Sequence, residues 1–196
     1  MTRLDEQTLE RVRRRDPAAL ELFFVAYVDR VYTYVRHLLR GADNVDDIVQ
    51  SSFLAMHKAI DRLDPRRDPS GWVFTIVTNV LRDWWRSREY RLRGRHVDLD
   101  ELWDTAPLGV ESVEERLVRA EEAAQLQAAL DRLAPADRQV IWLRTYEELG
   151  VAEVAEILGI TPEATRQRHS RAVQRLAREF KGASSLTTSG PEDAHG

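Results

Sequence analysis

Arginines near the C-terminal end of the chain carry its most evident chemistry. They recur along one segment as Arg166, Arg168, Arg171, Arg175 and Arg178. Guanidinium groups make charge-assisted hydrogen bonds with phosphates and bind guanine edges through paired bonds. The segment therefore has the chemistry of a DNA-binding helix. A solvated cationic face on an ordinary helical hairpin would show the same arginines. The neighbouring segments must therefore distinguish a DNA-binding helix from such a face.

The residues around these arginines have the order of a helix-turn-helix. Residues 151–158 place four apolar side chains on one helical face, namely Val151, Val154, Ala155 and Leu158. Gly159 suits the left-handed position that commonly follows a helix C-terminus. Thr161 can then cap a second helix, and Pro162 fits the first position of that helix. The arginine-rich helix is thus predicted to enter the major groove.

The N-terminal half predicts helices throughout, one of them with a surface suited to a protein partner. Asp16 and Pro17 have the types of a cap and a first-turn proline. Residues 44–60 predict a helix capped by Asn44, with a buried side made of Val45, Ile48, Val49, Ser52, Phe53, Met56 and Ile60. Its opposite stripe contains Asp47, Gln50, Ser51 and Leu54. An outward leucine beside acidic and amide groups suits docking, although a single exposed leucine is common.

A longer helix is predicted over residues 71–91, after a turn-rich loop. Its inward side chains are expected to be Val73, Ile76, Val77, Val80 and Trp84. Its polar ridge contains Thr75, Asn79, Arg82 and Arg86. Hydroxyl, amide and guanidinium groups on one ridge suit nucleic acid.

Charge is segregated along the sequence and locates the domain boundary. Residues 80–95 hold six arginines and two acids, a net charge of +4, whereas residues 97–130 hold nine acids and two arginines, a net charge of −7. Gly94, Pro107 and Gly109 interrupt helical periodicity in the segment of residues 94–112. We therefore expect an all-α fold of two small helical domains, residues 1–93 and 113–180, joined by an acidic linker at 94–112. Residues 181–196, rich in Gly, Ser and Thr, are predicted to be a disordered tail.

Composition excludes several classes of protein. The chain has 196 residues and no cysteine, so disulfide frameworks and cysteine-based zinc sites are ruled out. The N-terminus lacks the apolar core of a signal peptide and no run is long enough for a membrane helix, which predicts a cytoplasmic protein without membrane insertion. Its five histidines are scattered, with no phosphate-binding glycine loop and no nucleophile constellation. We expect no catalytic residue, metal or cofactor.

Three motifs together resemble the extracytoplasmic-function sigma factors of the sigma-70 family. They are NVDDIVQSSF at residues 44–53, GWVFTIVTNVLRD at residues 71–83, and the segment that runs from LAPADRQV at residue 133 through Arg171. The likeness covers residues 16–180 in the order and spacing of the family. Each motif is modest alone, but the two domains and linker make the joint match specific.

The resemblance implies a bacterial initiation factor that binds core RNA polymerase and directs it to promoter DNA. Asp47, Gln50 and Leu54 match the polymerase-binding helix of the family. The loop of residues 61–70, with Asn79, Arg82 and Arg86, matches the elements that open and recognise minus-ten DNA. The minus-thirty-five recognition helix is matched by Arg166, Gln167, Arg168 and Arg171. An anti-sigma protein is a further candidate partner.

Some positions depart from the family pattern. Ser51 replaces a usual glutamate and Gly150 a usual Ser or Thr cap, while Thr165 and His169 replace apolar residues. For His169 we favour a satisfied core position over a DNA contact or a pH-sensitive destabiliser. The rival function is a stand-alone helix-turn-helix repressor or activator, which would leave the Asp47, Gln50 and Leu54 stripe without a role.

Overall fold

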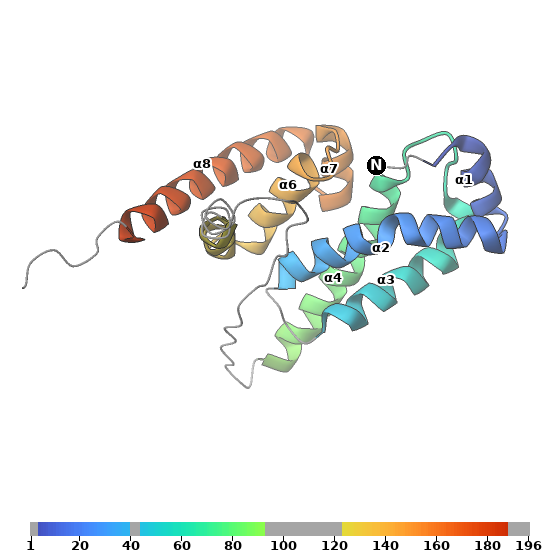
Figure 1. Ribbon diagram of the computed structural model, residues 1–196, viewed down its shortest axis with the longest axis horizontal. Coiled ribbons are helices and arrows are strands. Elements are labelled where there is room, and N and C mark those ends of the chain that lie inside the picture. Colours follow the sequence, from blue (N-terminus) through green and yellow to red (C-terminus); the bar gives the residue numbers. More distant parts are fainter. Residues whose placement is uncertain (1–3, 40–43, 93–122, 188–196) are drawn as a thin grey trace, which may run out of the picture.

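The computed structural model describes residues 4–39, 44–92 and 123–187, and every regular element in them is helical, as predicted. Figure 1 shows two groups of helices side by side, which we call the N-terminal and C-terminal domains. The N-terminal domain contains α1 (Glu6–Arg13), α2 (Pro17–Leu39), α3 (Val45–Ala59), the short 3-10 helix η1 (Ile60–Arg62) and α4 (Ser70–Leu92). The C-terminal domain contains a helix at residues 123–131, α6 (Pro135–Thr145), α7 (Val151–Leu158) and α8 (Pro162–Thr187).

Aromatic side chains form much of the core of the N-terminal domain. Phe23, Tyr34 and Phe74 are fully buried, and the Tyr34 and Phe74 rings meet edge to face with their centroids 5.1 Å apart. The Tyr34 hydroxyl shares a hydrogen bond of 3.1 Å with Thr78 Oγ1, so its polar atom is satisfied inside the core. These contacts join α2 to α4, and α3 packs against both.

Capping explains where several helices begin. Asp16 Oδ1 accepts a hydrogen bond of 3.0 Å from the Ala19 amide, which confirms the cap predicted before Pro17. The prediction for Asn44 is wrong, because its side chain makes no capping hydrogen bond. Asp46 and Asp47 instead place two negative charges in the first turn of α3, where they favour the positive end of the helix dipole.

The buried face of α4 is wider than its periodicity predicted. Val73 and Val77 are fully buried as expected, and Phe74 and Leu81 are fully buried although not expected. The remaining predicted residues are only half-buried, namely Ile76, Val80 and Trp84. The reason is that α4 contacts α3 on one side and α7 on another, so more than one stripe faces protein.

The C-terminal domain packs α8 against both α6 and α7. Its core contains the fully buried side chains of Val140, Leu143, Val154 and Ala172. Ile157 is buried to 2% exposure, whereas Val151 and Leu158, which we expected to face the core, are half-buried. The contact between α7 and α4 explains this, since Ile157 lies on the side of α7 that borders the loop before α4.

Helix α8 continues farther than predicted. It runs to Thr187, so residues 181–187 are helical rather than part of a disordered tail. Extending an existing helix fixes one residue per hydrogen bond, and no proline interrupts the chain before Pro191. Residues 188–196 and the predicted linker at 94–112 lie outside the described residues.

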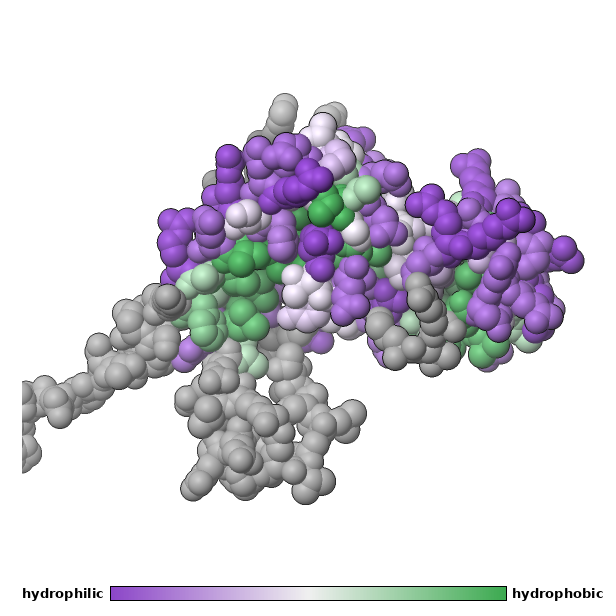
Figure 2. All heavy atoms as spheres, turned by 90° about the horizontal axis from the view of Figure 1, so that it is seen from above, coloured by the Kyte–Doolittle hydropathy of each residue, from purple (hydrophilic) through white to green (hydrophobic). Residues whose placement is uncertain are grey.

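The two domains are in contact, which the sequence did not predict. Helix α7 packs against α4, and α6 packs against the C-terminal end of α2. Figure 2 shows hydrophilic side chains over most of the face seen from above, with hydrophobic ones in patches between them. Within the described residues, no helix is both long and apolar enough to cross a membrane.

Candidate nucleic-acid and polymerase interface

The helix-turn-helix is built as the sequence predicted. Gly159 ends α7 in the left-handed region, with φ at +67°. Thr161 Oγ1 then accepts a hydrogen bond of 3.1 Å from the Ala164 amide, and Pro162 is the first residue of α8. Gly150 is the residue before α7, and the Glu153 carboxylate accepts a hydrogen bond of 2.8 Å from the Gly150 amide. That bond satisfies the Gly150 amide, whereas the amides of the first turn, which a Ser or Thr cap would bind, receive no side-chain cap from Gly150.

The N-terminal part of α8 exposes the polar side chains predicted to recognise DNA. Arg166, Gln167 and Arg171 are exposed, and Arg168 is half-buried. Glu163 organises two of them, since its carboxylate accepts bonds of 2.9 Å from Arg166 and 3.2 Å from Gln167. The structure therefore brings these four side chains together on one helix, with two of them held near the helix N-terminus.

The opposite face of α8 is directed into the C-terminal domain. Thr165 is fully buried, and its hydroxyl donates to the Thr161 carbonyl at 3.1 Å, so the polar atom is satisfied. His169 is half-buried, and burial together with the nearby Arg144 lowers the pKa of its imidazole. Its Nε2 is buried without a hydrogen-bond partner among the described residues. His169 is thus partly buried, as expected for a core residue. Its Nε2, however, lacks the hydrogen-bond partner that we expected.

The polar ridge of α4 is exposed from Asn79 onward, while Thr75 at its start is half-buried. Asn79, Arg82 and Arg86 are all exposed. Arg82 donates to Asn79 Oδ1 at 2.9 Å, while Arg86 pairs with Asp83 at 3.4 Å. The ridge thus presents one amide and two guanidinium groups, of which Arg82 and Asn79 form a connected pair.

The loop of residues 61–70 is held by short-range hydrogen bonds. Asp64 Oδ1 accepts from the Arg66 amide at 3.0 Å, and Asp68 Oδ1 accepts from the Ser70 amide at 2.9 Å. Ser70 also shares a hydrogen bond of 3.1 Å with the buried Tyr27 hydroxyl. These bonds fix the loop against α2, directly before the polar ridge of α4 begins.

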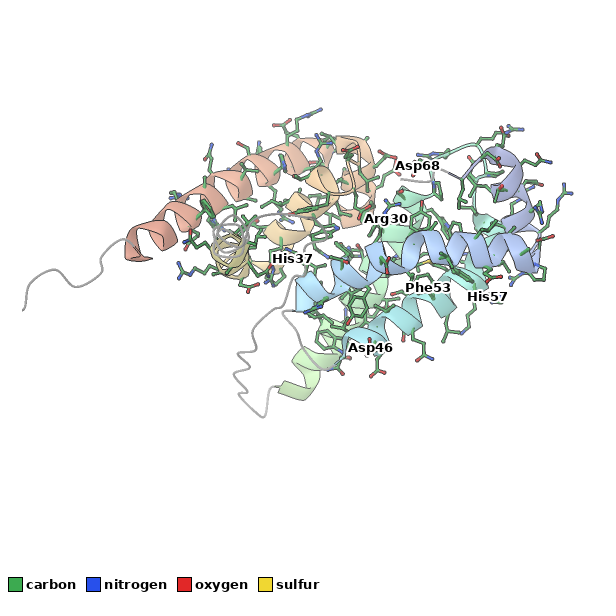
Figure 3. The ribbon with its side chains drawn as sticks, in the orientation of Figure 1. Arg30, His37, Asp46, Phe53, His57 and Asp68 are labelled. Atoms are coloured by element: carbon green, nitrogen blue, oxygen red, sulfur yellow. The ribbon has the colours of Figure 1, made fainter. Side chains whose placement is uncertain are left out.

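The predicted docking stripe belongs to α3, a helix that Figures 1 and 3 show on the side of the N-terminal domain away from α7 and α8. Asp47, Gln50 and Ser51 are exposed, and Leu54 keeps 56% of its surface accessible. The buried side of the same helix agrees with the prediction, except that Phe53 is only partly buried. The stripe is therefore available to a partner.

Two segments of the chain match family descriptions. Residues 23–91 match sigma-70 region 2, and residues 123–176 match sigma-70 region 4. The RNA polymerase sigma factor CnrH of Cupriavidus metallidurans is 32% identical over 139 residues, which cover 68% of this chain and 72% of CnrH. The chain belongs to the sigma-70 family. Its relatives include sigma factors of the ECF group, and like them it is a transcription initiation factor.

Two further comparisons agree with that assignment. The ECF RNA polymerase sigma factor BldN of Streptomyces coelicolor is 28% identical over 176 residues, which cover 88% of this sigma factor but 64% of BldN. The structure of sigma factor RpoE in complex with the anti-sigma factor NepR from Bartonella quintana superposes with a TM-score of 0.68 at 20% identity. It covers 83% of this sigma factor and 96% of the RpoE chain. At that identity the likeness shows the shared fold alone.

Sequence reasoning missed the residues that join the two domains of this sigma factor. Glu147, in the turn after α6, forms an ion pair with Arg30 of α2, and the Arg30 Nε atom lies 3.0 Å from the carboxylate. Arg138 of α6 is 2% exposed and donates to the carbonyl of Leu38 at 3.2 Å. Charged residues at helical positions normally indicate solvated faces, so no sequence signal separated these three from the others.

His37 belongs to the same contact. It is 3% exposed, and its ring lies 5.0 Å from the indole of Trp142 on α6. Burial, assisted by the positive charge of Arg138, lowers the pKa of His37 to about 4. Figure 3 shows His37 and Arg30 on α2, the helix that faces the C-terminal domain. No cluster of His, Asp and Glu suited to a metal ion occurs in the described parts of the chain.

Proposed function

We propose that this sigma factor binds core RNA polymerase through the α3 stripe of Asp47, Gln50 and Leu54. The observation that carries the proposal is the exposure of Leu54 between acidic and amide side chains, on a helix whose other side packs into the core. A stand-alone repressor needs no such second surface. Burial of an exposed leucine in an interface contributes about 1.5–3 kcal/mol, while the polar neighbours provide orientation.

We further propose that two surfaces of this sigma factor contact two different promoter elements. The loop of residues 61–70 with Asn79, Arg82 and Arg86 contacts minus-ten DNA, and α8 contacts minus-thirty-five DNA through Arg166, Gln167, Arg168 and Arg171. Exposed guanidinium and amide groups on both surfaces support this division. The proposed place of action is the cytoplasm. An anti-sigma protein is a proposed partner, because the similar RpoE chain was solved with one.

Run-off transcription tests the function directly. Core RNA polymerase with this sigma factor is incubated with a random promoter pool, and the transcribed templates are selected and sequenced. We expect two enriched motifs at a fixed spacing, and initiation that depends on the added protein. A protein that only blocks transcription from an existing promoter would establish the rival function of a repressor.

A matched pair of substitutions tests the α3 surface. Leu54→Arg is expected to weaken binding to core polymerase by at least about tenfold, because it removes about 1.5–3 kcal/mol of apolar burial. Leu22→Arg on α2 is the control, since Leu22 is equally exposed at 55% against 56%. Binding is measured by titration with labelled protein, and circular dichroism verifies that both variants keep their helix content. Equal affinity of Leu54→Arg and wild type for core polymerase would show that α3 is not part of the interface.

A further inference from the structure

The turn between α1 and α2 contains an arginine in an uncommon backbone conformation. Arg15 has a φ of +63°, in the left-handed region that glycine adopts far more readily than a residue with a side chain. The Arg15 amide donates to the Val12 carbonyl at 2.9 Å, and the Asp16 amide donates to the Arg11 carbonyl at 3.0 Å. These two bonds form the Schellman motif, which ends a helix and usually has glycine at the position of Arg15. The backbone of this turn therefore favours glycine, and the reason for an arginine must lie in its side chain.

The Arg15 side chain reaches from this turn to the C-terminal end of α3. Its guanidinium donates to the carbonyl of His57 at 3.0 Å and to the carbonyl of Lys58 at 3.5 Å. Both carbonyls belong to the last four of α3, which lack amide partners within the helix. The negative end of the helix dipole lies there as well, so it favours a positive charge. Figure 3 shows His57 at the end of α3 that is nearer to α1. Glycine could form the turn but could not make these contacts with α3.

The same guanidinium also contacts the first residue of the loop of residues 61–70. Arg15 Nη2 lies 3.8 Å from Asp61 Oδ1, and Asp61 belongs to η1. This short helix lies between two anchors, since Ile60 is fully buried and Leu63 is 2% exposed. It packs against both α1 and α3. Arg15 therefore joins the end of α1, the end of α3 and the start of the loop at one point.

The position of the loop depends on how its two ends are held. Its far end is fixed by the hydrogen bonds of Ser70 with Asp68 and Tyr27. Between the ends, a space of about 460 Å³ separates the loop from α1, with Asp64, Pro65 and Arg66 on its loop side. The middle of the loop is thus not packed tightly against α1. The contacts of Arg15 supply the polar attachment at the end where the loop begins.

We propose that Arg15 is a positioning residue for minus-ten DNA, because it holds the end of α3 and the first residue of the loop where the loop can contact the DNA. The inference rests on the minus-ten function proposed for the loop and Asn79. Arg15 precedes residues 23–91, so the match to sigma-70 region 2 does not include it. If the loop of a variant without these contacts is correctly placed for about one fifth of the time, the apparent Kd for minus-ten DNA rises about fivefold.

The variant Arg15→Gly separates positioning from stability. It removes the contacts with α3 and Asp61, but it also relieves the backbone strain of the turn. These two effects on the free energy of unfolding have opposite signs, so the melting temperature should stay close to that of wild type. Holoenzyme that contains Arg15→Gly should bind a single-stranded oligonucleotide with the selected minus-ten sequence about fivefold more weakly, while affinity for core polymerase changes by less than about twofold. A residue that only stabilised the fold would change the melting temperature and both affinities together, and that result would overturn the proposal.

Arg14→Gln is the matched control for the loss of a positive charge. Arg14 is the neighbour of Arg15 and pairs at 3.0 Å with Glu10, a residue of the preceding helix α1. Its guanidinium is therefore close to that of Arg15 in sequence but has its ion partner within α1. The control should bind the oligonucleotide as wild type does. Equal weakening by Arg14→Gln and Arg15→Gly would assign the effect to net charge and overturn the proposal.

Amide hydrogen exchange, followed by NMR on the full chain, tests the positioning without DNA. The Leu63 amide donates to the Ile60 carbonyl at 3.1 Å and the Arg66 amide to Asp64 Oδ1 at 3.0 Å. Both amides should exchange faster in Arg15→Gly than in wild type or Arg14→Gln, because local opening of the loop becomes easier. Exchange at the wild-type rate overturns the proposal.

Asn79→Ala reports separately on the proposed minus-ten surface. Weaker oligonucleotide binding by Asn79→Ala together with wild-type binding by Arg15→Gly overturns the proposal for Arg15 alone. Wild-type binding by Asn79→Ala refutes the proposed role of Asn79 instead, and the exchange rates of the loop amides then still show whether Arg15 positions the loop.

Discussion

Acidification should destabilise this sigma factor through His37. The pKa of His37 is about 4 in the folded chain, against an ordinary value of 6.5. Between these values the unfolded chain takes up a proton that the folded chain excludes, so stability falls as the pH falls. At pH 5 the unfolded imidazole is almost fully charged and the folded one largely neutral, which gives a loss of about 2 kcal/mol relative to pH 7.5.

The measurement is urea unfolding at pH 7.5 and pH 5, followed by circular dichroism, of wild type and His37→Phe. Phenylalanine keeps an aromatic ring against Trp142 but cannot titrate. The other ionisable groups are common to both proteins, so the difference between their pH slopes isolates His37. Equal slopes for wild type and His37→Phe would refute the reasoning.

Three further outcomes are expected. Asn79→Ala should reduce open-complex formation more than polymerase binding, and permanganate reactivity of promoter thymines measures this; normal melting would exclude Asn79 from the site. Arg168→Ala should cost about 1–3 kcal/mol and relax preference at one base of the minus-thirty-five element, whereas Arg178→Ala should weaken all sequences alike. A base-substituted promoter set distinguishes them, and a change of preference only in Arg178→Ala would reverse the proposed orientation of α8. Gly159→Ala should destabilise the chain by about 1–2 kcal/mol in thermal unfolding, because φ is +67° there; an unchanged melting temperature would contradict the strain.

The local structure was largely predictable because it depends on neighbours in sequence. The turn at Gly159, the cap at Thr161 and the proline that begins α8 follow from backbone chemistry that acts within four residues. The buried side of α3 follows from helical periodicity. Asn44 does not act as a cap because its backbone, with φ at −106° and ψ at 12°, is not in the extended conformation that an N-cap usually adopts, and residue type alone does not predict that conformation.

The contact between the domains was not predictable in the same way. Arg30, Arg138 and Glu147 have the residue types of solvated helix faces, and only the fold shows that each is shielded by the other domain. The same contact explains why Ile157 is buried beyond the expected stripe of α7. A periodic pattern identifies the face that packs within a domain, but it carries little information about a second, polar face.

The polar character of the contact between the domains agrees with a reversible association of the two. Interfaces between domains of one chain are more polar than permanent ones, and relative motion is their usual behaviour. A shielded ion pair such as Arg30 and Glu147 specifies how the domains meet, while its cost of desolvation limits the net stabilisation. An apolar contact of the same size would hold α7 on the loop more permanently. The charges at this boundary therefore suit two domains that can separate and meet again.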